Sequence, residues 1–209
     1  MVTILKHPIA GDHIAALRDK ATQPDAFRRH LDALATLLAV EALRDIRTKE
    51  VQVETPLAMA KCDIVDEPGL IITPILRAGV GMLNAVLNVI PYAQVGMVGI
   101  KRNEETAEPI AYYENVPQAL KGDELAVVID PMLATGGSVC SAIARLKNLG
   151  YRRIKFLCIV ASPQGLDKVQ SDHPDVQIYT AVRDEGLNSK CYILPGLGDA
   201  GDRIFGTLP

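Results

Sequence analysis

At 209 residues, 48% of them hydrophobic, the chain is long enough for one large α/β domain or, less easily, two small ones. A formal net charge of −3 argues against a general binder of nucleic acid or anionic membranes, and no apolar run approaches the roughly 20 residues of a membrane helix. The four cysteines have neither metal-ligand nor Cys-x-x-Cys spacing, and the N-terminus lacks the apolar core of a signal peptide, so we expect a cytoplasmic protein.

The first predicted element is a long amphipathic stretch over residues 25–47. Its apolar residues recur at helical spacing of three or four: Phe27, Leu31, Leu34, Leu38, Ala42 and Ile46. The stretch carries no phosphate-binding or metal-binding signature. Core packing or a subunit contact is therefore the role that we expect for it.

From residue 70 onward the pattern alternates between strand and helix. We predict strands at 70–76, 94–100, 125–129, 154–161 and 176–182, with helices at 82–89, 138–149 and 166–172. This alternation predicts an α/β fold with an open, mostly parallel, doubly wound sheet. In such sheets, ligands bind beyond the carboxyl ends of the strands.

The interval 101–123 breaks this alternation. It is polar at first, then alternates, and it is too long for a plain loop. We predict a two-stranded flap with its return strand at 110–114, placed at a strand end where it can act as a lid. Lys101 and Arg102 stand at the root of this flap.

The most informative motif is the strand, loop and helix at 125–149. Leu125–Ile129 is apolar on both faces, as a buried parallel strand should be. The loop ends in Thr-Gly-Gly-Ser, where the glycines admit a ligand to the backbone and the next helix points its unpaired amides. A plain turn does not need these four residues together, so phosphate binding is favoured. Asp130, at the strand end, suits sugar hydroxyls or a metal.

A second loop follows the strand at 70–76 and reads ILRAGVGM. Arg77 can donate two parallel hydrogen bonds to a phosphate or diphosphate, although alone it is equally compatible with a surface arginine. Lys101 and Arg102 follow another strand of the same sheet. Because the carboxyl ends of parallel strands meet at one edge, the three cations together favour an anion site there.

The glycine-rich tail contains a literal GxGxxG at Gly196, Gly198 and Gly201. We reject dinucleotide binding, because that fingerprint needs a following helix within a βαβ unit. The glycines instead predict a loop whose peptide groups approach a flat ligand. Asp199 and Asp202 either contact a metal or ligand hydroxyl or terminate turns. The four histidines lie away from these motifs, and we expect them on the surface.

Together, PILRAGVGM, RNEETAEPIAYY, DPMLATGGS and YILPGLGDAGDRIFGT resemble the type I phosphoribosyltransferases, and their uracil branch in particular. The resemblance runs over most of the chain. Pro131 stands where most loops of this type carry a second acid, as is usual for the uracil branch. Residues 161–165 read ASPQG where the family often has AAPEG, and we expect no functional consequence of that change.

The resemblance implies transfer of ribose 5-phosphate from 5-phospho-α-D-ribose 1-diphosphate (PRPP) to uracil, with magnesium. It implies catalytic roles for Arg77, Arg102 and Asp130. PRPP would be held by these three residues together with Asp199 and the loop residues Pro131, Met132, Leu133, Ala134, Thr135, Gly136, Gly137 and Ser138. Uracil would be held at Ile193, Gly198, Asp199 and Ala200. Magnesium would be held through PRPP, with Asp199 the candidate for a direct ligand.

The resemblance also implies a single domain over residues 1–209. Its parts would be an N-terminal helical arm at about 1–50, the flap at about 101–123 and a base-binding tail at about 191–209. We expect a homodimer or homotetramer, a GTP effector, and neither nucleic acid nor membrane as a partner. Two alternatives stay open: an RNA-binding regulator of pyrimidine genes built on the same loop, and a transferase for orotate or a purine.

Overall fold

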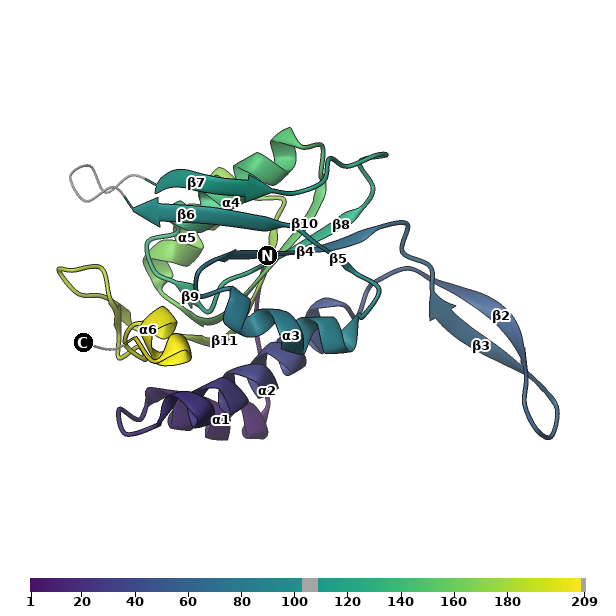
Figure 1. Cartoon of the computed structure of the whole chain (residues 1–209), viewed down its shortest axis with the longest axis horizontal. Coiled ribbons are helices and arrows are strands. Elements are labelled where there is room, and N and C mark those ends of the chain that lie inside the picture. The colour runs from purple at the N-terminus through teal and green to yellow at the C-terminus, as the bar shows by residue number, and fades with distance from the viewer. Residues whose placement is uncertain (103–108, 208–209) are drawn as a thin grey trace.

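The computed structural model describes residues 1–102 and 109–207, and for Arg102 only the backbone (Figure 1). Its core is a sheet in the order β1-β11-β10-β8-β4-β6-β7, with short strands β5 and β9 paired to β4 and β10. The strands are β1 (Val2–Ile4), β4 (Leu70–Leu76), β5 (Gln94–Val95), β6 (Met97–Arg102), β7 (Pro109–Asn115), β8 (Leu125–Ile129), β9 (Met132–Leu133), β10 (Arg153–Ala161) and β11 (Gln177–Arg183). Every described pairing in this sheet is parallel except β6 with β7.

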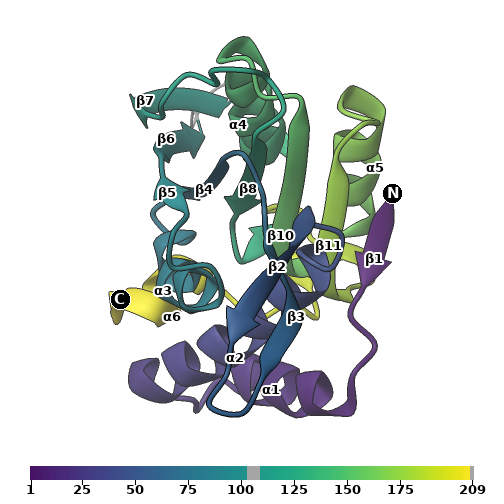
Figure 2. The ribbon, with the colours of Figure 1, turned by 90° about the vertical axis from the view of Figure 1, so that its right-hand side faces the viewer.

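Helices cover both faces of the sheet, which confirms the doubly wound α/β prediction. One face carries α1 (Pro8–Arg18), α2 (Pro24–Ala42), α3 (Val80–Val89) and α6 (Ala200–Phe205). The other face carries α4 (Gly137–Asn148) and α5 (Pro163–Asp172) (Figure 2). All five residues of β8 are buried, because neighbouring strands flank it and both of its faces are covered. No helix in the described part of the chain is long and apolar enough to cross a membrane.

The predicted amphipathic stripe is the buried face of α2. Phe27, Leu31, Leu34, Leu38 and Ala42 are all buried in the core. The helix ends at Ala42, short of the predicted stretch, and Ile46 packs on the same core from beyond its end. The spacing therefore continues past the helix because the segment that follows keeps facing the sheet.

Two predicted elements differ in detail from the structure. The strand predicted at 94–100 is interrupted at Gly96, but β5 and β6 keep one register along β4, so the break is local. The flap is confirmed as the antiparallel β6–β7 ribbon, with its return strand at 109–115. The part of the predicted flap at 103–108 lies outside the described residues.

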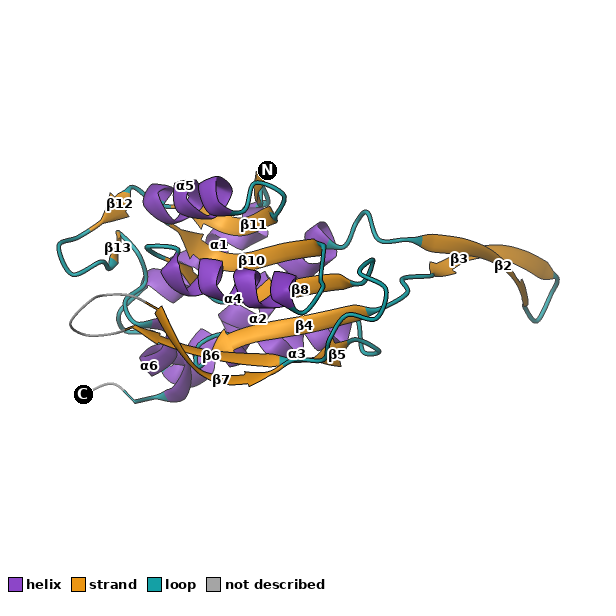
Figure 3. Cartoon of the chain, turned by 90° about the horizontal axis from the view of Figure 1, so that it is seen from above, coloured by secondary structure: helices purple, strands orange, loops and turns teal. Residues whose placement is uncertain are grey.

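An antiparallel hairpin of β2 (Thr48–Glu54) and β3 (Met59–Val65) was not predicted from the sequence. It extends away from the body of the molecule (Figure 3). The carboxyl ends of β4, β6 and β8 lie at the opposite end, together with the C-terminal tail (Figure 1). In that tail, β12 (Gly186–Leu187) and β13 (Ile193–Leu194) form a separate small ribbon. The motifs singled out in the sequence therefore meet at one edge, far from the hairpin.

Candidate active site

The loop between β8 and α4 forms a cradle with open backbone amides. Gly136 precedes α4 in the left-handed conformation, with φ of 82°, and no side chain in the described part of the protein caps the helix. Within the helix, the amide of Cys140 reaches back to the Gly136 carbonyl at 2.9 Å. The residues before it line a cavity of about 90 Å³: Asp130, Met132, Leu133, Ala134, Thr135, Gly136, Gly137, Ser138 and Val139. An uncapped helix N-terminus beside such a cavity is suited to an anion.

The cradle rests on the first turn of α5 through Ser162. The Ser162 hydroxyl donates to the Ala134 carbonyl oxygen at 2.5 Å and accepts from the Gly165 amide at 2.9 Å. A Cβ on Gly165 would lie 2.5 Å from that same carbonyl oxygen, so only glycine permits the close approach. Ser162 and Gly165, which lie in the segment that reads ASPQG, thus support the loop directly. Nothing local in the sequence indicated this contact.

Asp130 stands where the cradle meets a second cavity. Its Oδ1 accepts from the Met132 amide at 3.4 Å, and its side chain is only partly exposed. Burial raises the pKa of this carboxyl group from 3.8 to about 7, and the Met132 hydrogen bond opposes that shift only weakly. Pro131 does not line either cavity; its carbonyl oxygen instead accepts from the amides of Ile159 and Val160.

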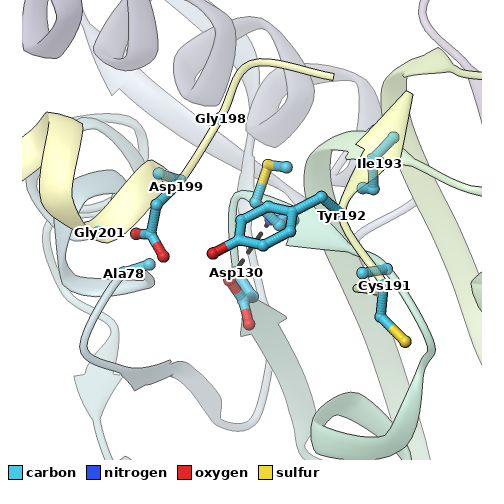
Figure 4. Close-up of a pocket in the computed structure, with 11 residues that line it drawn as sticks. Ala78, Asp130, Cys191, Tyr192, Ile193, Gly198, Asp199 and Gly201 are labelled. Atoms are coloured by element: carbon cyan, nitrogen blue, oxygen red, sulfur yellow. Dashed lines mark hydrogen bonds between the residues drawn. The ribbon is translucent and has the colours of Figure 1, made fainter. Parts of the chain in front are cut away.

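The second cavity has a volume of about 260 Å³ and lies between the cradle and the tail (Figure 4). Its lining residues are Ala78, Asp130, Met132, Ala134, Cys191, Tyr192, Ile193, Gly198, Asp199, Ala200 and Gly201. It shares Asp130, Met132 and Ala134 with the cradle, so the two cavities adjoin. All four residues predicted to hold uracil line this cavity.

Sequence reasoning missed part of this lining, including Ala78 and Tyr192. The Tyr192 ring extends across the cavity between Asp130 and Asp199 (Figure 4). An aromatic residue directly before the predicted base contact at Ile193 was the available signal. Ala78 follows Arg77 and carries no chemical signal of its own.

The tail folds into a turn followed by a short helix. Gly196 and Gly198 have φ of 61° and 80°, which side chains disfavour. Asp199 then caps α6, its Oδ1 accepting from the Asp202 amide at 2.9 Å. A helix of six residues therefore does follow the GxGxxG pattern, contrary to the reason that we gave for rejecting it. No strand follows α6 among the described residues, so the βαβ unit that the fingerprint requires is not formed there.

The cations of the predicted anion site come from two strand ends. Arg77 follows β4, is exposed, and its Nη2 lies 3.6 Å from Asp202 Oδ1, which places it beside α6. Lys101 is exposed in β6. The backbone of Arg102 ends the same strand, but its side chain lies outside the described residues. The flap borders the cradle, since a Cβ on Gly137 would lie 3.9 Å from Pro109 of β7.

The histidines do not line either cavity. His7 is exposed, whereas the other three are partly buried, so the expectation of surface histidines is only partly right. His13 and His30 approach each other at 2.9 Å between their Nδ1 atoms, and His173 Nε2 lies 3.2 Å from the Cys140 carbonyl oxygen. Among the described side chains, no group of three or more histidines, cysteines or acids could hold a metal ion.

Comparisons with known proteins identify the family of the chain. The model of the family described as uracil phosphoribosyltransferase matches residues 4–207. A uracil phosphoribosyltransferase of Dictyoglomus turgidum is 47% identical over 99% of this chain and all of its own length. A solved protein of Aquifex aeolicus is 38% identical, covers 98% of each chain and superposes with a TM-score of 0.91. The solved APRTase of Giardia lamblia, 15% identical with a TM-score of 0.53 over 75% of this chain and 81% of its own, shares the fold alone. The chain therefore belongs to the uracil phosphoribosyltransferase family.

Proposed function

We propose that this chain transfers the ribose 5-phosphate of PRPP to uracil, giving UMP and diphosphate in pyrimidine salvage. The observation that carries this proposal is the pair of adjoining cavities that meet at Asp130. One presents helix amides suited to a phosphate, and the other presents peptide groups suited to a flat base. In the reaction, the bond from C1′ of the ribose to diphosphate breaks, and a bond from C1′ to N1 of uracil forms.

The cradle would bind the 5′-phosphate of PRPP. Residues 134–138 line that cavity, so their amides and hydroxyls would be the ligands of the phosphate, and the dipole of α4 favours negative charge there. Met132 and Leu133, unlike Pro131, line the cradle and would lie along the ribose, and Asp130 would accept hydrogen bonds from the ribose hydroxyls. Because both cavities share this carboxylate, it would hold the sugar between the phosphate and the base.

Arg77 and Arg102 would bind the diphosphate as negative charge develops on it. The transition state for such a transfer has oxocarbenium character, so positioning and electrostatics matter more than a strong base. Arg77 is exposed, and its contact to Asp202 is long at 3.6 Å, which leaves it able to turn toward the substrate. Arg102 would act from the end of β6.

The donor set fits magnesium, because two carboxylates, Asp130 and Asp199, face one cavity and Mg²⁺ prefers oxygen ligands. We propose that PRPP supplies most of the ligands and that Asp199 is the candidate for a direct one. Its Oδ1 already caps α6, so Oδ2 is the atom available. The bound ion would neutralise the charge of the leaving diphosphate.

Backbone groups of the tail would select the base. Uracil presents an acceptor, a donor and an acceptor along one edge, and peptide groups at Ile193, Gly198 and Ala200 line the cavity that would receive it. Cytosine would place its amino group against the wrong partner. A buried polar group without a partner discriminates strongly between such bases.

The β6–β7 ribbon would act as a lid over the cradle. Its return strand begins beside Gly137, which places it next to the proposed phosphate site. We expect PRPP to protect the peptide bonds after Lys101 and Arg102 from trypsin. Cleavage at the same rate with and without PRPP would remove this role.

We further propose that the chain is one domain that forms a homodimer or homotetramer in the cytoplasm. The β2–β3 hairpin supports self-association, because it exposes Val53, Leu57, Met59, Ile64 and Val65 on a ribbon of two strands. Such ribbons are marginally stable alone. Light scattering would measure the assembly.

A GTP effector is proposed on the family resemblance, and rates with and without GTP would test it.

A panel of bases is the decisive test of the proposed function. The chain is incubated with PRPP and magnesium, and diphosphate release is followed with uracil, cytosine, orotate or hypoxanthine. We expect release with uracil alone. Release with orotate or hypoxanthine but not uracil would overturn the assignment. A salt-dependent shift of RNA in a gel would support the RNA-regulator alternative instead.

A further inference from the structure

Two cavities border the tail segment 195–199, and Gly198 and Asp199 line both of them. One is the cavity of about 260 Å³ that is proposed to bind the base, and the other is a separate cavity of about 330 Å³. The cavity of about 330 Å³ is lined by Arg18, Lys20, Pro195, Gly196, Leu197, Gly198, Asp199 and Arg203. Within this fully described segment, Leu197 is the apolar side chain that is buried, whereas Pro195 is exposed. Packing alone therefore fixes the segment weakly, and polar contacts must hold it.

An ion pair holds Gly196 by both of its backbone groups. The Gly196 amide donates to Asp184 Oδ2 at 2.8 Å, and Arg18 Nη1 donates to the Gly196 carbonyl oxygen at 3.1 Å. The two side chains also pair with each other, at 2.5 Å from Arg18 Nη2 to Asp184 Oδ1. The Asp184 side chain is only 3% exposed, so this contact is shielded from water. A paired and shielded charge of this kind is a firm anchor.

Arg203 holds Leu197, the residue that follows Gly196. Its guanidinium donates to the carbonyl oxygen of Leu197 at 2.9 Å, to that of Asp19 at 2.6 Å, and to that of Leu17. It also lies over the Phe27 ring, 4.4 Å from the ring centre. One side chain thus joins the tail to the end of α1 and to the core face of α2.

We propose that Arg18, Asp184 and Arg203 are positioning residues for the base. They act through Gly196 and Leu197 on the peptide groups of residues 198–200, and the inference rests on the proposed binding of uracil there. A binding group must be held within about 0.5 Å of its working position, which a segment bordered by two cavities does not achieve by itself. Removing these hydrogen bonds would therefore weaken uracil binding while leaving the cradle that would bind PRPP intact.

The chain offers a matched control at the other end of the sheet. Arg153 pairs with Glu67 at 2.5 Å, with side-chain exposures of 31% and 0%, against 24% and 3% for Arg18 and Asp184. Arg153 also donates to a backbone carbonyl, that of Asp123, at 3.0 Å. The two ion pairs have the same chemistry and similar burial, and only the first touches the tail.

The experiment compares Asp184→Asn with Glu67→Gln by melting temperature and by the KM for each substrate. We expect similar losses of melting temperature. Only Asp184→Asn should raise the KM for uracil, by about tenfold, with the KM for PRPP changed by less than about twofold. Equal uracil KM values in the two variants, or parallel increases in both KM values for Asp184→Asn, would overturn the positioning role.

Arg203→Lys provides a second variant, should Asp184→Asn fold poorly. Lysine keeps the charge, but its single ammonium group cannot reach carbonyls in three places as the planar guanidinium does. The same selective increase in uracil KM supports the inference, and an unchanged uracil KM overturns it. Wild-type turnover of uracil is measured alongside. If the wild type turns over uracil but the variants keep its uracil KM, the proposed function stands and only the positioning role fails.

Discussion

The cradle and the tail form the two halves of the proposed site, yet they are held in place in different ways. The cradle is a short loop between the buried strand β8 and helix α4, and it rests on the first turn of α5. The tail has strands of two residues and a helix of six, and two cavities border its central turn. Regular elements therefore position the proposed phosphate site, whereas side chains from distant elements position the proposed base site.

The largest expected effect tests whether the cation beside the tail acts on the leaving diphosphate. Arg77→Ala should lower turnover by about 10²–10³-fold, because a cation facing developing negative charge is lost. The melting temperature should hardly change, since Arg77 is 64% exposed and its ion pair is long. Arg29→Ala removes a similarly exposed arginine on α2 and should leave turnover unchanged. Near-normal rates for Arg77→Ala would refute its role.

A pH series tests whether ionisation of Asp130, which lines both cavities, lowers the free energy of unfolding. The pKa of Asp130 in the folded protein is about 7 and exceeds the ordinary value of 3.8. Between pH 3.8 and pH 7, the folded chain therefore binds more protons than the unfolded chain. The free energy of unfolding should therefore fall as pH rises through that window, by a few kcal/mol at about 1.4 kcal/mol per pKa unit. Asp130→Asn should lack this fall. Urea denaturation of both proteins without substrate measures it, and parallel curves would contradict the assignment.

Substitution of a glycine in the tail separates base binding from folding. Gly198→Ala should raise the KM for uracil about tenfold, because Gly198 lines the base cavity with φ of 80°. Gly206→Ala is the control, with φ of 70° and similarly open surroundings, but outside that cavity. Both variants should lose about 1 kcal/mol of stability to backbone strain. Equal losses of uracil affinity in the two variants would argue against a binding role for Gly198.

The smallest expected effect concerns the support beneath the cradle. Ser162→Ala removes a hydrogen bond to the Ala134 carbonyl and the cap of α5, and should cost about 1 kcal/mol in the free energy of unfolding. Any change in KM should be confined to PRPP. A change confined to uracil would show that the two halves are coupled more tightly than their separate supports suggest.

Local patterns were enough to predict the frame of the molecule. The strand at 125–129 and the one at 70–76 were predicted to the residue, because buried parallel strands read as unbroken apolar runs. The β2–β3 hairpin was missed, since it projects from the body and no core face dictates its pattern. Ser162 was also missed, because its value depends on a carbonyl that lies 28 residues away in the chain.

Residue patterns alone were sufficient to predict the doubly wound sheet, the glycine-rich loop at its carboxyl edge and the family to which the chain belongs. These follow from residues close together in the chain, whose spacing sets both secondary structure and motif. Only the tertiary structure decided how the tail is held. Arg18 and Asp184 are 166 residues apart, and Arg203 and Leu17 are 186 apart. Contacts at such separations leave no periodic trace in a single sequence, because their geometry exists only once α1, β11 and α6 have packed together.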